Sequence, residues 1–303
     1  MKKIAIISFK IYLILLSTVQ VTYAQHISLV ADSTLKIAKH RALDILQTMD
    51  TTVRSQLWPN IKPSFFYNNV RNNILYPDKI NQGNNDNFCS YAAISHLLLL
   101  YQPDVYTKMM LSLYETGSTQ LYSKRLLKPS EQIRHAAGSL RNNGELNVLH
   151  ADQMWFLSMA DGFKGYINLF NRRYNPGDEN TLWAASNYHK FNKMLRAFGG
   201  YKVHTVGSDL IRPGIRDIFS YLNNQLKKGV VMLFINSSLM YPHRFKWLNL
   251  PAPSHFVILY ELTKVTAGLY KIRYWDYGLK TEQFISRRRL RKTIYGISVI
   301  TRQ

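Results

Sequence analysis

The spacing of the apolar residues changes once along the chain, at the glycine pair Gly199-Gly200, and this change limits the fold more than any other feature. Before it, apolar residues recur every three or four positions, which is typical of amphipathic helices. We expect helices at 33–54, 88–101, 103–116, 129–141, 150–162 and 181–198, with a loop at 57–87. After it, apart from one helix at 215–226, short apolar runs predict strands at 201–206, 230–236, 255–262, 270–276, 281–285 and 295–301. A helical part followed by an antiparallel sheet is an α+β fold.

The first 24 residues have the pattern of a secretory signal peptide. A basic start, Met1-Lys2-Lys3, precedes an apolar run at 4–19, and Thr22-Tyr23-Ala24 puts small residues where a signal peptidase needs them. We therefore expect an exported protein, periplasmic or secreted, that runs from 25 to 303. Its length allows a single domain with two lobes, a helical lobe at about 25–198 and a sheet lobe at about 199–303.

The chain is strongly basic, with a formal net charge of +21 at pH 7, and loss of the three lysines in the signal segment leaves +18. A field of this sign attracts polyanions. For an exported protein we expect anionic wall polymer or lipid as partner, and no nucleic acid. The densest basic run is a candidate contact for them and consists of Arg287, Arg288, Arg289, Arg291 and Lys292. The alternative is a solvated helix face that maintains solubility.

The only cysteine, Cys89, is the leading candidate for a reactive group. One cysteine cannot form an intramolecular disulfide, and exported proteins usually pair the cysteines they keep. Asn87 is expected to cap the helix that follows, which places Cys89 in its first turn. Unpaired amides and the helix dipole stabilise a thiolate there. The alternative is a small buried side chain without chemistry.

Two further residues complete a candidate catalytic set. His255 opens an apolar strand directly after a loop, and Asp276 ends the next expected strand. Adjacent antiparallel strands can bring these ends together, so that Asp276 accepts a hydrogen bond from one ring nitrogen of His255 and the other faces Cys89. The remaining histidines do not pair at metal-ligand spacing on a recognisable helix face, so we expect neither a metal nor a cofactor.

Five segments reproduce a known order: 87–93, 197–203, 226–231, 254–259 and 275–278. In them a cysteine opens a helix, a glycine pair ends another, and a glycine precedes an apolar strand. A histidine begins the next strand and an acid ends the one after. This order resembles the papain-like cysteine peptidase superfamily, and most of all the enzymes that process bacteriocin leaders and their uncharacterised exported relatives. The resemblance spans about residues 82–301, with 103–180 unmatched.

The resemblance implies a two-lobed fold with the cysteine-bearing helix at its centre, and cleavage of an amide bond. Cys89 would attack the carbonyl, His255 would move the proton, and Asp276 would orient His255. A glutamine upstream of the cysteine donates a hydrogen bond to the oxyanion in that superfamily, and Gln82 fits this role. Its rivals are two nearby asparagines, Asn85 and Asn87.

Two positions depart from the superfamily pattern. Ser90 stands where glycine is usual after the cysteine, and Tyr277 stands where proline is usual after the acid. The sequence therefore leaves three functions open. The first is a hydrolase acting on a protein, a peptide or peptidoglycan. The second is a transglutaminase-like acyl transferase, and the third is a catalytically inactive papain-like binding protein.

Overall fold

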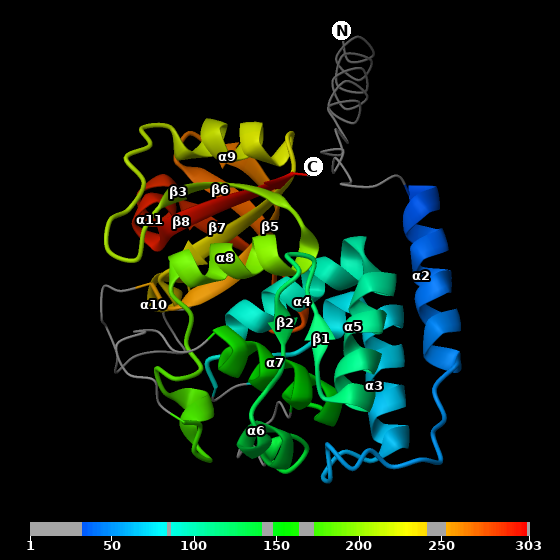
Figure 1. Ribbon diagram of the computed structural model, residues 1–303. Helices are drawn as coiled ribbons and strands as arrows, with labels where there is room; N and C mark the ends of the chain where they lie inside the picture. The colour runs from blue at the N-terminus through cyan, green and yellow to red at the C-terminus, as the bar shows by residue number, and fades with distance from the viewer. Residues whose placement is uncertain (1–31, 84–85, 141–147, 164–172, 241–252, 302–303) are drawn as a thin grey trace, which may run out of the picture.

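The computed structural model describes residues 32–83, 86–140, 148–163, 173–240 and 253–301 (Figure 1). The expected signal peptide with its cleavage site, and Asn85, lie outside these residues. Among the residues that are described, no helix combines the length and the apolar character needed to cross a membrane.

The first part of the chain is helical. Its helices are α2 (Asp32–Gln47), α3 (Pro63–Leu75), α4 (Cys89–Tyr101), α5 (Pro103–Thr116), α6 (Glu131–Ala136), α7 (His150–Phe163) and α8 (Tyr188–Gly199), with 3₁₀ turns η1 (Pro77–Lys79) and η2 (Asp178–Asn180). Two short strands, β1 (Thr119–Gln120) and β2 (Leu126–Leu127), pair between α5 and α6. Proline at the start of α5 and left-handed Gly117 after its end set its bounds.

Helix α3 lies inside the segment 57–87, so the expectation of a loop there is wrong. Asparagine is typical of loops, and the segment is rich in it, but two of these residues are structural. Asn69 and Asn73 are buried and donate side-chain hydrogen bonds to the carboxylate of Asp152 at 3.0 Å and 2.7 Å. The buried apolar residues of α3 recur every four positions, at Phe66, Val70 and Ile74.

Other expected helices exist with different bounds. Helix α2 ends at Gln47, and α6 covers only part of 129–141. Helix α8 begins at Tyr188, not at 181, because Asn187 caps it by accepting a hydrogen bond from the N–H of Lys190 at 2.7 Å.

The second part of the chain is an antiparallel sheet of six strands in the order β3-β8-β4-β5-β6-β7. The strands are β3 (Lys202–Gly207), β4 (Val230–Ile235), β5 (His255–Thr266), β6 (Leu269–Asp276), β7 (Leu279–Ser286) and β8 (Ile294–Thr301). Three helices accompany them: α9 (Ile218–Leu226), α10 (Ser237–Met240) and α11 (Arg287–Thr293). The predicted α+β class is therefore confirmed.

At the centre of the sheet both faces are covered. Every residue of the central strand β4 is buried, unlike the alternation of a strand that faces water on one side. Its residues Val230, Met232 and Phe234 join a core shared with the helices of the first part. The residues between them, Val231, Leu233 and Ile235, join a second core with α9 and α11.

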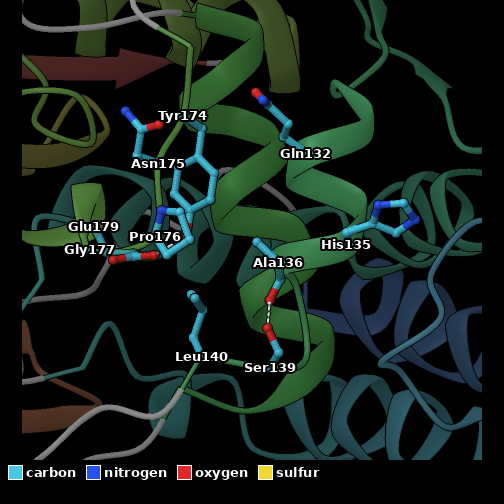
Figure 2. Close-up of a pocket in the computed structure, with 10 residues that line it drawn as sticks. All are labelled: Gln132, His135, Ala136, Ser139, Leu140, Tyr174, Asn175, Pro176, Gly177 and Glu179. Atoms are coloured by element: carbon cyan, nitrogen blue, oxygen red, sulfur yellow. Dashed lines mark hydrogen bonds between the residues drawn. The ribbon is translucent and has the colours of Figure 1, made fainter.

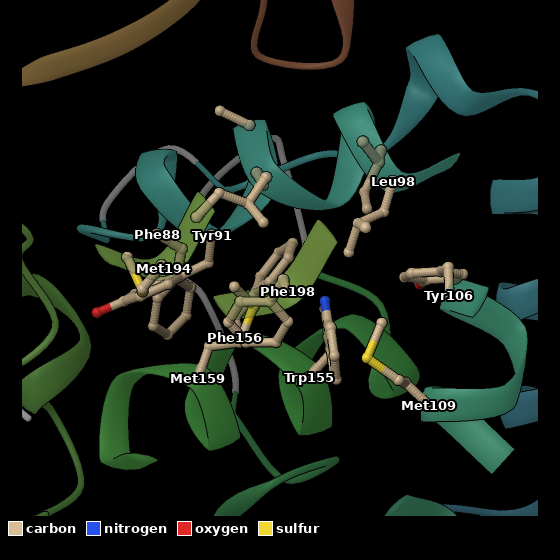
Figure 3. Packing of buried hydrophobic residues seen from close by; sticks show 14 of the residues in the cluster. Phe88, Tyr91, Leu98, Tyr106, Met109, Trp155, Phe156, Met159, Met194 and Phe198 are labelled. Carbon is tan, nitrogen blue, oxygen red and sulfur yellow. The ribbon is translucent and has the colours of Figure 1, made fainter. Parts of the chain in front are cut away.

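The helices that lie in sequence between Cys89 and the six-stranded sheet pack directly on α4. Figure 3 shows Trp155, Phe156 and Met159 of α7 facing side chains of α4 and α8. The Trp155 indole is fully buried, donates to the hydroxyl of Ser95 at 2.8 Å and meets the ring of Phe198 edge-on at 5.5 Å. These helices form a packed layer against α4.

Candidate active site

Cys89 is the first residue of α4, and its side chain is 9% exposed. The N-cap is Phe88, not Asn87, so that expectation is wrong. Asn87 is held by a segment far along the chain: its backbone N–H donates to the carbonyl of Glu179 at 2.7 Å and its side-chain amide to that of Thr181 at 2.8 Å. The first amides of a helix have no partner within the helix, so the thiol of Cys89 lies beside backbone N–H groups of the first turn.

Asp86 shapes the turn into α4. Its carboxylate accepts a hydrogen bond from the N–H of Phe88 at 3.0 Å. Gly83 approaches the same carboxylate closely: its φ is +89°, and a Cβ added there would lie 2.1 Å from Asp86 Oδ2. Burial raises the pKa of Asp86 to about 7, and the nearby Glu179 adds to the shift. This carboxyl group with a raised pKa lies three residues before Cys89, in the turn that leads into α4.

His255 and Asp276 form a buried pair at one end of the sheet. His255 begins β5 and Asp276 ends β6, and because Ile258 pairs with Trp275 the two residues lie at the same end of their strands. Nε2 of His255 is 2.5 Å from Oδ1 of Asp276, and the two residues are 3% and 2% exposed. The carboxylate therefore fixes the orientation of the ring.

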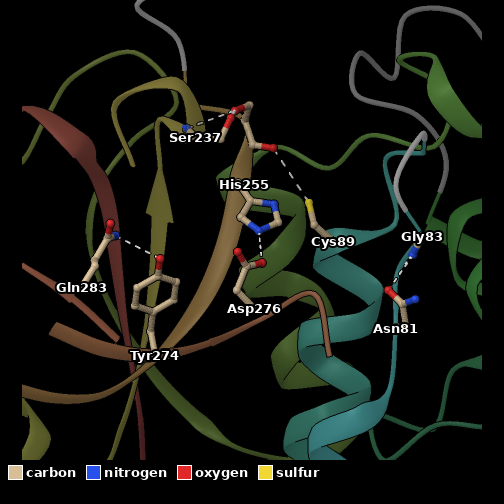
Figure 4. Close-up of polar contacts among 9 residues, drawn as sticks. Asn81, Gly83, Cys89, Ser237, His255, Tyr274, Asp276 and Gln283 are labelled. Carbon is tan, nitrogen blue, oxygen red and sulfur yellow. Dashed lines mark hydrogen bonds and ion pairs between the residues drawn. The ribbon is translucent and has the colours of Figure 1, made fainter. Parts of the chain in front are cut away.

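The side chain of Cys89 lies beside the His255 ring (Figure 4) and helps to raise the pKa of that ring. Because Nε2 is hydrogen-bonded to Asp276, the ring nitrogen that faces Cys89 is Nδ1 (Figure 4). The carbonyl oxygen of Ser254 lies 3.9 Å from the sulfur, and the Ser254 hydroxyl is 2.6 Å from that of Ser237. The structure thus brings together three of the four residues that the sequence analysis singled out, in the order thiol, imidazole and carboxylate.

The charge of this trio follows from its burial and its contacts. Burial lowers the pKa of His255, but the hydrogen-bonded carboxylate of Asp276 and the neighbouring Tyr277 and Cys89 outweigh it and raise the pKa well above its usual value. The ring is therefore favoured as an imidazolium.

The raised pKa of His255 predicts a pH-dependent contribution to stability. Because the folded protein holds this proton more tightly than the unfolded chain, the stabilisation is fully present below the unfolded pKa of about 6.5 and is lost as the pH rises through the folded value. We expect the difference in free energy of unfolding between wild type and His255→Gln to shrink with rising pH above about 6.5. Urea titrations across that range measure it, and a constant difference would contradict the assignment.

Tyr277 is a contact of His255 to which the sequence analysis gave no role. With Gly278 it forms the two-residue turn between β6 and β7, and the φ angles of the two residues are 48° and 73°, as in a type I′ hairpin turn. The Tyr277 ring stacks on the His255 ring, with centroids 4.8 Å apart and planes at 13°. The Tyr277 ring therefore covers one face of the imidazole.

Tyr277→Ala is expected to slow alkylation of Cys89 by iodoacetamide about 2- to 10-fold, since a stacked aromatic pair is worth about 0.5–1.5 kcal/mol. Tyr277→Phe keeps the ring and is expected to react like wild type. Mass spectrometry of the single cysteine gives both rates. Equal slowing in the two variants would mean that the hydroxyl, and not the stacked ring, matters.

Gln82 is buried, at 2% exposure, in the segment before α4. Its neighbours Asn81 and Gly83 lie beside the first turns of that helix in Figure 4. Its Oε1 atom has no hydrogen-bond partner among the described residues. Of the two rivals for the oxyanion role, Asn87 already donates its amide to Thr181, and Asn85 lies outside the described residues. The role of Gln82 stays a prediction.

His96, two turns along α4 from Cys89, joins this helix to β6. Its ring stacks on Trp275 with centroids 4.4 Å apart and planes at 6°, and its Nε2 is 2.7 Å from the hydroxyl of Tyr260. Burial lowers the pKa of His96 to about 4, so the ring is neutral. Trp275 precedes Asp276, and the stack therefore fixes the strand that carries the carboxylate against the helix that carries the thiol.

A pocket of about 610 Å³ lies between α6 and the turn at η2 (Figure 2). Tyr174 and Glu179, whose side chains hydrogen-bond to each other, line one side, and Gln132 and Ser139 line the other. Glu179 also holds the backbone of Asn87, so this wall is tied to the loop before Cys89. Among the described residues, no group of three His, Cys, Asp or Glu side chains is placed to hold a metal ion.

Comparisons with protein-family models, with curated proteins and with solved structures found no match to this chain. Its function is therefore inferred from the geometry of the site and from the segments that carry the resemblance to the papain-like superfamily.

Proposed function

We propose that the protein is an exported cysteine hydrolase of papain-like architecture that cleaves an amide bond in a protein, a peptide or peptidoglycan. The observation that carries the proposal is the buried, hydrogen-bonded pair His255–Asp276 with Cys89 beside the imidazole, the thiol at a helix start and the carboxylate behind the ring. A nucleophile in contact with a base that a third group orients is the general pattern of covalent acyl transfer.

In the first half of the reaction, the Cys89 thiolate attacks the amide carbon, and a carbon–sulfur bond forms as the carbonyl oxygen becomes an oxyanion. The backbone N–H of Cys89 and the side-chain amide of Gln82 are the proposed donors to this oxygen. The intermediate collapses with cleavage of the carbon–nitrogen bond. His255 gives its Nδ1 proton to the leaving amine, which leaves an acyl thioester on Cys89.

In the second half, His255 accepts a proton from water, and the resulting hydroxide equivalent attacks the thioester. The carbon–sulfur bond breaks, the carboxylic acid leaves, and the thiolate–imidazolium pair is restored. Asp276 keeps the ring in the tautomer that presents Nδ1 to the sulfur and stabilises the charged ring. An amine in place of water would make the same thioester a donor for acyl transfer.

The test is turnover of three substrate classes by the purified chain: an unfolded protein, a mixture of short peptides, and peptidoglycan. New amino groups that appear with wild type and not with Cys89→Ala support the hydrolase. If added amine is incorporated into the acyl product in preference to water, the acyl transferase is the correct function. If no class is cleaved and no acyl group accumulates on Cys89, the protein is an inactive binding protein.

Export is part of the proposal and has its own test. The basic start, the apolar run and the small residues before Gln25 predict that a signal peptidase removes residues 1–24. In the native host, mass spectrometry of the secreted or periplasmic fraction is expected to find a chain that begins at Gln25. A chain retained in the cytosol with residues 1–24 still attached would contradict it.

A further inference from the structure

We propose that one surface of the sheet part binds membranes that contain anionic lipid. In this surface, which we call the basic face, the apolar pair Leu210-Ile211 enters the bilayer and the basic residues of α11 bind lipid head groups. The proposal does not depend on the proposed catalytic function, because none of these residues contacts Cys89, His255 or Asp276 in the interactions described above.

The apolar pair stands out among the exposed side chains. Leu210 is 86% exposed and Ile211 is 74% exposed, the two highest values among the large apolar residues that the structure describes. The turn that presents them is held by Ser208, whose hydroxyl accepts hydrogen bonds from the N–H of Leu210 at 3.2 Å and of Ile211 at 2.8 Å. Two adjacent apolar side chains are thus kept in water by an ordered turn.

Helix α11 supplies the charge. Its residue Leu290 is buried in the second core and fixes the helix to the sheet, while Arg287, Arg288, Arg291 and Lys292 are exposed. The ion pairs found in the described part of the chain involve none of these four side chains. The acid beside them is Asp217, which interacts with Arg287 and whose carboxylate caps α9 by accepting hydrogen bonds from Ser220.

The apolar turn and the basic helix belong to one surface, although about 80 positions separate them in sequence. Arg212 donates to the carbonyl of Lys292 at 2.8 Å, and its guanidinium lies 4.3 Å from the centre of the Tyr295 ring. Arg287 donates to the carbonyl of Arg216 at 3.4 Å. Figure 1 shows the loop after β3 running beside α11. Arg212 and Arg216 therefore extend the positive charge of α11 up to the apolar pair.

This combination favours a lipid surface over a soluble polyanion. Basic side chains attract anionic lipid, wall polymer and nucleic acid alike. Only a bilayer also offers an apolar phase that removes Leu210 and Ile211 from water, and peripheral membrane proteins use both contributions together. Binding is therefore expected to need anionic lipid and to weaken with salt. A soluble polyanion that binds the basic residues is expected to leave the environment of the apolar pair unchanged.

The direct test reads the environment of the apolar pair itself. In the Cys89→Ala chain, Ile211→Cys labelled with a polarity-sensitive dye reports this position alone, and Ile37→Cys, on α2 and 58% exposed in wild type, is the matched control. Vesicles of phosphatidylglycerol and phosphatidylcholine are expected to shift the emission of the first label to the blue and leave the second unchanged. Phosphatidylcholine vesicles, or an anionic polysaccharide alone, are expected to shift neither.

A second measurement tests the charge. Arg288→Glu/Arg291→Glu is expected to lower the affinity for phosphatidylglycerol vesicles by about tenfold or more, judged by the dye at position 211. Lys36→Glu/Lys108→Glu changes the net charge equally on exposed positions of α2 and α5 and is expected to bind like wild type. The proposal is overturned if the dye stays in water while vesicles bind, if both charge variants lose affinity equally, or if the polysaccharide alone produces the shift.

Discussion

Replacing His255 with alanine is expected to lower the rate of amide cleavage by about 10²–10⁴-fold, because the variant loses the group that moves the proton in both halves of the reaction. The same substitution removes the imidazolium that stabilises the thiolate of Cys89. The rate is measured as the release of amino groups from whichever substrate class the wild type cleaves. His189→Ala, which removes an exposed histidine of α8, is the matched control and is expected to retain full activity.

Asp276→Asn sharpens this prediction. Asparagine is close in size to aspartate but can present its amide nitrogen to Nε2, which allows the wrong tautomer of His255. We expect a loss of activity that approaches that of His255→Ala with little change in fold. Wild-type activity in both variants would remove His255 and Asp276 from the mechanism and leave Cys89 without a base.

Trp155→Ala is expected to cost about 3–5 kcal/mol of the free energy of unfolding, the usual range for truncating a fully buried aromatic side chain. The indole fills the space between α7, α4 and α8 and donates to Ser95, so its loss leaves a cavity and removes one of the two hydrogen bonds of the Ser95 hydroxyl. A cost of this size is a large part of the stability of a typical domain. Denaturant titration followed by circular dichroism measures it.

The matched control is Phe284→Ala on β7, whose ring is 60% exposed in wild type, with an expected change within about 0.5 kcal/mol. The Trp155 variant also tests how the helices between Cys89 and the sheet relate to the site. Because these helices share a core with α4, we expect the helices and the site to unfold in the same transition. A separate early transition that leaves Cys89 as reactive as in wild type would show that they fold apart from it.

Much of the fold could be predicted because local patterns and long-range packing agree. The change at Gly199-Gly200 does separate helices from sheet, and the apolar runs after it are the strands of that sheet. Helix α3 was missed because its asparagines, which favour loops, are satisfied by Asp152 about 80 positions away. The cap of α4 was misassigned for a similar reason, since Glu179 and Thr181 hold Asn87.

The candidate site, like the fold, could be predicted only in part from the sequence. Cys89, His255 and Asp276 could be found because each stands at the end of a recognisable element, and antiparallel pairing joins such ends. The Tyr277 ring over His255 had only a weak signal, a two-residue turn between strands. Of the basic face, the sequence showed the basic run of α11 but not its meeting with the apolar turn, because Arg212 and Lys292 meet only after β3 and β8 have paired.

The most direct measurement of the central claim is the rate at which iodoacetamide alkylates Cys89 at neutral pH. The chain has one cysteine, so the product is unambiguous. The proposed mechanism ascribes the reactivity of this thiol to the helix start and to the imidazole beside it. We predict that Cys89 in the folded wild type reacts about tenfold or more faster than in His255→Ala and faster than in the unfolded chain. Equal rates in all three would contradict a catalytic thiolate–imidazolium pair and favour a binding protein.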